Sequence, residues 1–420
     1  MNSGESERFK RNQEGSTNNE NRKRQRKEYK QLCDETDYEI RDGKRYVIPY
    51  VYKHETHCKQ RWFGKAILDV YAKEFGAYSR EYYEDAIKKG RIRVNGKCVD
   101  CAYMLKNGDT ITHSVHRHEP PVPYYPIKVI GETDDMFAIN KPSSIPVHAC
   151  GSYRYNTVEM IIRKELHLDS FFFIHRLDRV TSGVLLLARK KEMAAALSEE
   201  LQRGGCHKVY LAVVAGNLRV GSETPAENVE VVNGKAIKVT RNIAVVSQKE
   251  GIMQCSAMEG KPACTYVFPL HYSASQNCTL VECLPMTGRT HQIRLHLKYL
   301  SHPIDDDFNY NEAIHVPKRE FKQWTESGED EDDSGLTESE LAIKHCRWCR
   351  MTEEERLDDL FKDEQLKYTS IHLHALSYTI HNSTFQTDLP DWEIMKEVNA
   401  EKLLQEIREN KEMVFALESK

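Results

Sequence analysis

The residues best suited to chemistry lie in one polar loop, His175–Gly183. Its only carboxylate, Asp178, has Arg176 and Arg179 as close neighbours in the chain. A nearby positive charge favours the ionised form of a carboxyl group, whose ordinary pKa is about 4, so Asp178 cannot donate a proton at neutral pH. It can act as a nucleophile or as an acceptor. The alternative is an ordinary loop acid that pairs with an arginine or caps a turn.

Two apolar runs, Phe171–Ile174 and Val184–Ala188, flank the loop and predict buried strands. The loop reads His-Arg-Leu-Asp-Arg-Val-Thr-Ser-Gly. It resembles the active-site signature of the RluA-type pseudouridine synthases, His-Arg-Leu-Asp-x-x-Thr-Ser-Gly. The resemblance implies an isomerase that converts uridine to pseudouridine within RNA and needs no cofactor or metal. It also implies that Asp178 is the nucleophile and that Arg176 fills the space left when the target base leaves its stack.

Two further segments resemble elements of the same family. Lys208–Gly216 alternates as a strand and matches Lys-x-Tyr-x-Ala-x-Val-x-Gly, and Thr287–Arg294 reads Thr-Gly-Arg-Thr-His-Gln-Ile-Arg. The resemblance implies that Tyr210 packs on the target uracil and that Arg294 pairs with Asp178. Arg289 is the second choice for that pair, or a phosphate contact. Without the flanking match, Tyr210 would be interpreted as a half-buried strand tyrosine.

Two other stretches match the family with departures. Met136–Asn140 predicts a strand, and the following Lys-Pro-Ser-Ser-Ile-Pro-Val-His has Ser144 where the family has glycine. In the segment Ser301–Asp307, Ser301 and Asp306 replace glycines of the bacterial pattern, whereas Asp307 matches its acid. These departures concern the local turns and leave the expected catalytic positions intact.

The stretch Gly151–Thr157 resembles a eukaryotic branch of the family. This branch includes the tRNA pseudouridine-32 synthases and RNA pseudouridylate synthase domain-containing protein 2. The resemblance implies a tRNA substrate modified at position 32 of the anticodon loop. Messenger RNA and ribosomal RNA remain alternative substrates.

Residues 46–118 are expected to form a small RNA-binding module. The pattern predicts helices over 62–75 and 82–89 and strands over 91–94 and 110–115, with a tight turn at Asn95-Gly96. This order resembles the module that many bacterial pseudouridine synthases carry before the catalytic domain. The residues expected to contact phosphates are Lys88, Lys89, Arg91, Arg93 and Lys97. The alternative is an accessory domain with a solvated basic face.

The chain has 420 residues, a formal net charge of -4 and 40% hydrophobic residues. No apolar run reaches the roughly 18 to 20 residues of a membrane span, so no membrane association is expected. Residues 1–45 are expected to be a disordered charged tail, in which Arg22–Lys27 could serve nuclear import or grip RNA. We therefore expect a cytoplasmic or nuclear monomer whose partner is RNA. Acidic residues in the tail disfavour a mitochondrial presequence.

The remaining chain is expected to form one catalytic domain of the α+β class. A proline linker at 119–123 precedes it, and it spans 124–392 with a mixed, mostly antiparallel sheet. A polar insert at about 311–366 interrupts it, and the stretch 326–340 carries eight acids and no Lys or Arg. Removing that stretch changes the formal charge from -4 to -4 + 8 = +4, so the rest of the chain is basic. A charged helix is expected over 393–420.

Two other function classes fit the sequence less well. A non-catalytic RNA-binding protein would tolerate the loss of Asp178, Tyr210 or Arg294, and all three are present. A zinc nucleobase deaminase would need a His-x-Glu motif, which the chain lacks. The group His345, Cys346 and Cys349 could ligate zinc, but a single Cys-x-x-Cys lacks its second pair of ligands, so no metal is expected.

Overall fold

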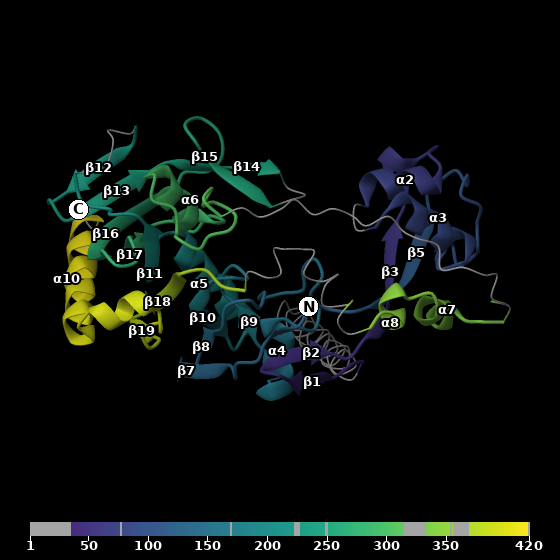
Figure 1. Cartoon of the computed structure of the whole chain (residues 1–420), viewed down its shortest axis with the longest axis horizontal. Coiled ribbons are helices and arrows are strands. Elements are labelled where there is room, and N and C mark those ends of the chain that lie inside the picture. Colours follow the sequence, from purple (N-terminus) through teal and green to yellow (C-terminus); the bar gives the residue numbers. More distant parts are fainter. Residues whose placement is uncertain are drawn as a thin grey trace, which may run out of the picture. The chain divides into compact units, whose positions relative to one another are not determined.

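The computed structural model describes residues 35–75, 78–168, 170–221, 227–247, 251–314, 333, 335–352, 355 and 369–418. These residues fall into two compact units (Figure 1). The large unit lies within 122–316 and 368–420, and the small unit within 34–121 and 317–367. Among the described residues, no helix has the length and apolar character needed to cross a membrane.

In the described part of the large unit, one 11-stranded sheet has the order β12-β13-β16-β17-β11-β18-β10-β8-β7, with β19 beside β18 and β9 beside β10. Figure 1 shows this sheet running the length of the unit. Its strands are β7 (Lys128–Glu132), β8 (Met136–Lys141), β9 (Phe172–Phe173), β10 (Ser182–Ala188), β11 (His207–Ala215), β12 (Val229–Val232), β13 (Ala236–Thr240), β16 (Cys264–Ser273), β17 (Cys278–Pro285), β18 (Leu373–Ile380) and β19 (Ser383–Gln386). The short strand β6 (Val122–Pro123) and the hairpin β14 (Asn242–Ser247) to β15 (Ile252–Ser256) lie outside this sheet.

Inside the sheet, β10 pairs with β18 in parallel, whereas the other pairs of described strands in this sheet are antiparallel. The apolar run Val184–Ala188 is fully buried there, as its composition predicts. Gly183 pairs with Ala375 and has φ +110°, and a Cβ at Gly183 would lie 2.2 Å from the Ala375 carbonyl oxygen. Only glycine fits, because both the backbone angle and the close approach exclude a side chain.

Helices flank this sheet. They are α4 (Val158–Glu165), α5 (Lys191–Gln202), α6 (Gln292–Tyr299), the 3-10 turn η3 (Glu393–Glu397) and α10 (Ala400–Glu418). Although α10 is highly charged, it buries Leu403 and Ile407 against the sheet strands β11, β17 and β18, and Val414 against β16 and β17. The charged C-terminal segment is therefore an amphipathic helix that completes the core of the large unit.

The small unit has a three-stranded antiparallel sheet in the order β3-β5-β4, packed with two helices. Its elements are β1 (Tyr38–Arg41), β2 (Lys44–Val47), β3 (Tyr50–His57), η1 (Gln60–Trp62), α2 (Ile67–Glu74), α3 (Arg80–Lys88), β4 (Ile92–Val94) and β5 (Thr110–Arg117). The core gathers Trp62, Ile67, Tyr71 and Tyr83 from the helical segments and Ile111 from β5. The expected order of helix, helix and strand pair is present.

Several expected boundaries differ from the structure. The hairpin β1–β2 lies partly within the expected tail of residues 1–45, whereas residues 1–34 and the basic run 22–27 lie outside the described residues. The first helix begins at Ile67, because residues 60–62 form a separate 3-10 turn. The last described strand, β19, ends at Gln386, six residues before the expected end of the catalytic domain at 392. The linker residue Glu119 is buried and accepts a hydrogen bond from Tyr50 at 2.7 Å, so it packs within the small unit.

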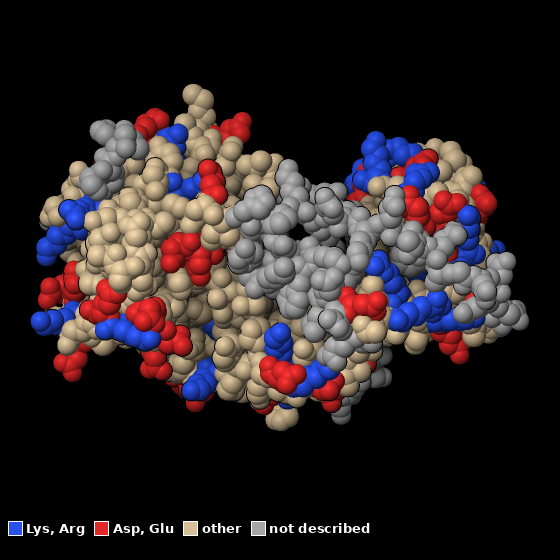
Figure 2. Space-filling view, in the orientation of Figure 1, with Lys and Arg blue, Asp and Glu red and all other residues tan. Residues whose placement is uncertain are grey.

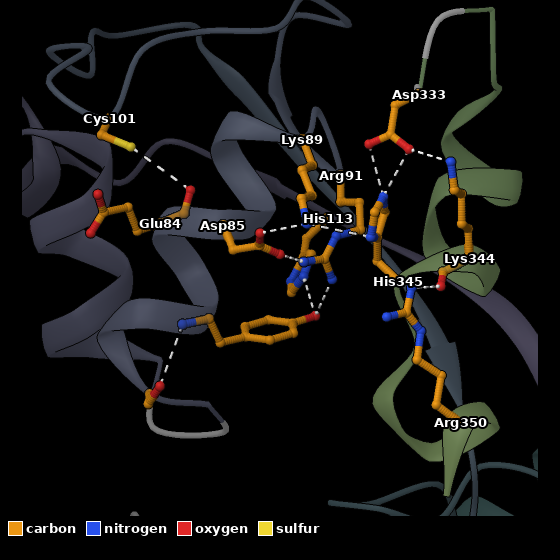
Figure 3. A network of polar contacts seen from close by, with 12 residues as sticks. Glu84, Asp85, Lys89, Arg91, Cys101, His113, Asp333, Lys344, His345 and Arg350 are labelled. Atoms are coloured by element: carbon orange, nitrogen blue, oxygen red, sulfur yellow. Dashed lines mark hydrogen bonds and ion pairs between the residues drawn. The ribbon is translucent and has the colours of Figure 1, made fainter. Parts of the chain in front are cut away.

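The insert is the largest difference from the expected domain organisation. Its described residues from 333 onward form α7 (Glu338–Lys344) and α8 (Arg347–Arg350) and belong to the small unit, whereas residues 311–314 belong to the large unit. Glu338 lies 2.9 Å from Lys53 Nζ and 3.3 Å from Arg93 Nε. Figure 3 shows His345 between Lys89 of the module, at 3.4 Å, and Asp333 of the insert, at 2.8 Å. The acidic insert is therefore attached to the basic module by complementary charge.

Candidate active site

A cavity of about 350 Å³ opens beside the signature loop in the large unit. It combines a carboxylate, several cations and two aromatic rings. Its lining comes from the loop before β10, from the end of α5, from β11 and β18, and from the chain between the end of β17 and the start of α6. The lining residues are His175, Arg176, Leu177, Asp178, Thr181, Leu201, Gln202, Lys208, Tyr210, Pro285, Thr287, Gly288, Arg289, Thr290, His291, Gln292, Ile293, Arg294, Leu373 and Tyr378.

Lys141 holds the loop that carries Asp178 through hydrogen bonds to the loop backbone. This lysine is fully buried at the end of β8, and its Nζ donates to the carbonyl oxygens of Thr181 at 2.8 Å and Arg179 at 3.2 Å. His175 fixes the start of the loop, because its Nε2 accepts a hydrogen bond from the backbone N–H of Leu186 at 3.1 Å. Burial lowers the pKa of His175 to about 3, so the ring is neutral and suited to accept that bond.

Arg294 is the cation nearest to Asp178 that is always charged. Its side chain is 2% exposed, and its Nη1 lies 3.4 Å from Asp178 Oδ2. The same guanidinium donates to both oxygens of the fully buried Asp307, at 2.6 and 2.8 Å. This bidentate pair leaves Nη1 directed at Asp178. Burial opposes the charged form of Arg294, but the Asp307 carboxylate raises its pKa above the ordinary value.

Asp178 is ionised in this setting. Burial raises the pKa of Asp178, but His291 in its protonated form and the Arg294 guanidinium outweigh this effect and hold the pKa below its usual range. His291 Nε2 lies 3.6 Å from Asp178 Oδ2, yet burial lowers the pKa of His291, so its ring is mostly neutral at pH 7. Arg294 therefore supplies the positive charge that persists at neutral pH. The Asp178 side chain keeps 23% exposure, which leaves it accessible from the cavity.

Aromatic rings form another wall of the cavity. Tyr210 on β11 contacts the hydroxyl of Tyr378 on β18 through its own hydroxyl. Tyr378 stacks on His175 with centroids 4.8 Å apart and an interplanar angle of 16°. Burial raises the pKa of Tyr210, so its hydroxyl stays protonated. The ring of Tyr210 is thus fixed at both its backbone and its hydroxyl end.

The segment between β17 and α6 is organised by Gln292. Its Oε1 accepts from Thr287 Oγ1 at 2.7 Å and from the backbone N–H of Arg289 at 3.0 Å, and its Nε2 donates to the Cys264 carbonyl at 2.9 Å. His291, just before the helix, adopts φ +56°. Its Nδ1 lies 2.6 Å from Tyr310 Oη, which fixes the ring beside Asp178.

The arginines expected to contact RNA near the loop both line the cavity. Arg176 is exposed. Arg289 is partly buried and donates from Nε to the Pro262 carbonyl at 3.0 Å. The pair of Asp178 with Arg294, which we expected first, is present, whereas Arg289 is not paired with Asp178 in the described structure.

The expected phosphate contacts of the module are in different environments. Arg91 is 2% exposed and donates to Asp85 at 2.5 Å and to Tyr82 at 3.2 Å (Figure 3), so it stabilises the small unit and is not placed to bind phosphate. Lys89 pairs with Asp85 at 3.0 Å and Arg93 with Glu338, both inside the small unit. Lys88 and Lys97 are exposed, although Lys88 lies 2.6 Å from Glu84.

The surface charge is mixed. On the face shown in Figure 2, Lys and Arg side chains stand in small groups among acidic and uncharged ones. RNA binding through such a face depends on particular exposed cations more than on one broad positive field.

Sequence reasoning missed three residues that build the site. Lys141 and His291 lie within two segments that resemble family motifs, but neither residue was assigned a role from the sequence. Tyr378 lay in a strand with no distinguishing motif, and only the pairing of β11 with β18 brings it to Tyr210. The places of Lys141 and His291 in these two motifs could have indicated a role in the site, whereas no local pattern indicated one for Tyr378.

Comparisons with known proteins agree with this arrangement. The family model described as RNA pseudouridylate synthase matches residues 135–299, and the S4 domain model matches residues 68–111. Pseudouridylate synthase RPUSD2 of Homo sapiens is 41% identical over 286 residues, which are 68% of this chain and 49% of that protein. The chain therefore spans about half the length of that relative.

Two proteins of Saccharomyces cerevisiae are also similar. The mitochondrial tRNA pseudouridine(32) synthase is 37% identical over 289 residues, covering 68% of this chain and 59% of that protein. The tRNA pseudouridine(31) synthase is 32% identical over 391 residues, covering 84% of this chain and 96% of that protein. This last similarity extends over nearly the whole of the yeast protein.

Proposed function

The chain belongs to the RNA pseudouridylate synthase family, and from this premise we propose that it isomerises uridine to pseudouridine in RNA. The observation that carries the proposal is the ionised Asp178 in an open cavity, held against Arg294, which Asp307 fixes in turn. A carboxylate placed this way can attack or deprotonate a sugar, and an isomerisation consumes no second substrate.

The reaction assigns a role to each group in the cavity. Asp178 attacks C1′ of the target uridine or assists deprotonation of its sugar. The N1–C1′ bond breaks and the base rotates. A C5–C1′ bond then forms as the bond between Asp178 and C1′ breaks, or as the sugar regains the proton that Asp178 took. C5 loses its proton and N1 gains one. Arg294 keeps Asp178 ionised and oriented. No atom is lost, and the roles of Asp178 and Arg294 need no further reactant.

Tyr210 serves the base in this proposal. Its ring lies in the cavity wall, fixed through its hydroxyl contact with Tyr378. A base stacked on an aromatic ring gains about 1 to 3 kcal/mol, enough to hold a detached uracil while it rotates. We assign catalytic roles to Asp178, Tyr210 and Arg294 on this basis.

The RNA contacts follow from exposure. Arg176 is exposed at the cavity and is suited to occupy the space that the flipped base leaves in the RNA. Arg289 lies at the same cavity and is assigned to a phosphate. In the module, Lys88 and Lys97 are exposed, and Lys89 and Arg93 become available only when their pairs within the small unit open. Arg91 has no such role.

Asp178→Asn tests the chemistry. The change is nearly isosteric, so the protein should fold normally while tritium release from carbon-5-labelled uridine RNA stops. Asp134→Asn, at an exposed position on the β7–β8 turn, is the matched control and should retain turnover. Near-wild-type turnover by Asp178→Asn would refute the mechanism.

We further propose tRNA as the substrate, with uridine 32 of the anticodon loop as the target. Loop bases cost less to flip than paired ones, and an S4 module beside a catalytic domain can hold the adjoining stem by its phosphates. The names of the yeast relatives support tRNA, and they differ by one nucleotide in the modified position. Pseudouridine mapping of RNA from cells with and without the protein tests this: loss confined to messenger or ribosomal RNA would refute it.

A non-catalytic RNA-binding role is the second candidate, and the test separates the two. If the protein only binds RNA, the wild type and Asp178→Asn should bind RNA equally well, and neither should release tritium.

We also propose that the protein acts as a monomer in the cytoplasm or nucleus. Sedimentation of the purified chain and fractionation of cells that express a tagged copy test these points, and a mitochondrial fraction would contradict the location.

A further inference from the structure

Four side chains of the types that bind metal ions meet in the small unit, and none of them lines the cavity. They are His116 and His118 at the end of β5 and Cys346 and Cys349 at α8. The ligand atoms all lie within 4.8 Å of one another. Because more than 220 positions separate the two pairs in the chain, only the fold brings them together.

The distances suit one tetrahedral ion. Cys349 Sγ lies 3.1 Å from His116 Nδ1 and 3.5 Å from His118 Nε2, and Cys346 Sγ lies 3.4 Å from His118 Nε2. Metal–sulfur bonds of about 2.3 Å and metal–nitrogen bonds of about 2.05 Å at tetrahedral angles place sulfur and nitrogen about 3.6 Å apart. The four atoms thus need only small movements to enclose an ion.

Local structure explains why the side chains converge. Alternate residues of a strand share a face, so His116 and His118 point the same way, and their rings lie 4.9 Å apart. Arg117 between them lies over the ring of Tyr52 instead. Cys346 precedes α8 and Cys349 lies in its single turn, which is the two-residue spacing of zinc-binding Cys-x-x-Cys motifs. Trp348 stacks on His118 with an interplanar angle of 27° and covers one side.

We propose that His116, His118, Cys346 and Cys349 bind a structural Zn²⁺ that fastens the insert to the S4 module. Two thiolates and two imidazoles form a closed set of four ligands, the arrangement of structural zinc sites, with no position left for a substrate. The second pair of ligands that the sequence lacked beside Cys-x-x-Cys is His116 and His118 at the end of β5. His345 is not a ligand, because it lies between Asp333 and Lys89 (Figure 3).

The insert has a physical need for such a fastening. In its described part, α8 buries no residue of its helix, and α7 buries Leu341 and Ala342. A segment with so little apolar burial requires another source of binding free energy, which a metal supplies. The ion would keep α7 against the module, where Glu338 pairs with Lys53 and Arg93.

Metal analysis of the untagged full-length protein, purified from cells grown with added zinc, tests the proposal. We expect about one zinc per chain in the wild type and a loss of most of it in Cys349→Ser and His118→Ala. Cys98→Ser, at an exposed cysteine of the same unit, and His345→Gln should retain the zinc. A wild-type protein free of zinc, or Cys349→Ser with full zinc content, would overturn the proposal.

Cobalt provides a readout that does not depend on the folding of a variant. Wild-type protein stripped by a chelator and refilled with Co²⁺ should show the thiolate charge-transfer and visible bands of tetrahedral cobalt. Stripping should also make the segment of α7 and α8 more sensitive to limited proteolysis, and zinc should restore its resistance. Octahedral cobalt spectra, or proteolysis unchanged by zinc, would show instead a metal-free cluster of hydrogen-bonded thiols and imidazoles.

Discussion

Replacing Asp307 with asparagine tests the idea that a buried ion pair positions the cation of the active site. Asp307 is fully buried and Arg294 is 2% exposed, so water cannot compensate for the lost charge. Removing one partner of a buried pair costs about 3 to 5 kcal/mol. For a unit of this size each kcal/mol lowers the melting temperature by about 2 to 4 °C, so a decrease of about 10 °C is expected.

The same change should reduce turnover. Asparagine can accept from only one nitrogen of Arg294, and the guanidinium then loses the bidentate contact that directs Nη1 at Asp178. A misplacement of about 1 Å can cost on the order of a hundredfold in rate. Single-turnover tritium release with saturating enzyme, at a temperature where the variant is folded, measures this loss separately from RNA binding.

The chain offers a matched control on the same helix. Lys298 of α6 pairs with Glu312 at 2.9 Å, and the two side chains are 39% and 87% exposed. Exposed pairs contribute about 0 to 1 kcal/mol, so Glu312→Gln should leave melting and turnover close to wild type. If Asp307→Asn and Glu312→Gln behaved alike, the assignment of Asp307 as the residue that positions Arg294 would be refuted.

Three further predictions concern other parts of the molecule. Gly183→Ala should prevent folding of the large unit, seen as insoluble protein, whereas Gly151→Ala, at φ +54° in open space, should cost only about 1 kcal/mol. Glu338→Gln should raise RNA affinity up to about fivefold in a low-salt filter-binding assay, because Lys53 and Arg93 lose their acidic partner. Glu340→Gln is the control, since the Glu340 side chain caps its own helix. Equal affinities of the two variants would contradict the prediction. The pKa of Asp178 lies below the ordinary carboxyl value, so Asp178 stays ionised as the pH falls. Single-turnover rates should therefore stay constant from pH 7 to about 5. A decrease of the rate near pH 6 that the protonation of Asp178 alone explains would contradict this.

Much of the large unit could be predicted because its elements are local. The run Val184–Ala188 is a fully buried strand, and the alternating run from Lys208 lies in β11. The signature loop and the segment before α6 were assigned to one site, and the structure brings Asp178 and Arg294 together there. The neighbouring residues of a contiguous motif indicate the role of each of its members, so such residues could be predicted from the sequence.

The failures concern burial and long-range contact. Arg91 stood among basic residues in the sequence, but its side chain lies against α3, where Tyr82 and Asp85 accept hydrogen bonds from its Nη1 and Nη2. The insert was placed in the catalytic domain because the chain enters and leaves it there, yet its charges pair with the module. Likewise, the sequence showed no second pair of possible ligands beside Cys346, whereas the fold brings His116 and His118, at the end of β5, close to it. Each of these features depends on which parts of the folded chain contact one another. A local sequence pattern does not contain that information.

The position of β18 has a consequence for how the protein is made. This strand joins β11 to β10 at the middle of the sheet, yet it follows the insert and is among the last strands to leave the ribosome. Until it emerges, β10 with β8 and β7 has no hydrogen-bonded connection to β11 with β17 and β16 within the described sheet. Domains of a growing chain usually fold as units from the N-terminus, so the small unit can begin to fold while two half-sheets wait with open edges. A ribosome that stops before Leu373 would therefore release a chain whose two half-sheets lack the strand that unites them, an aggregation-prone product that cannot assemble its active site.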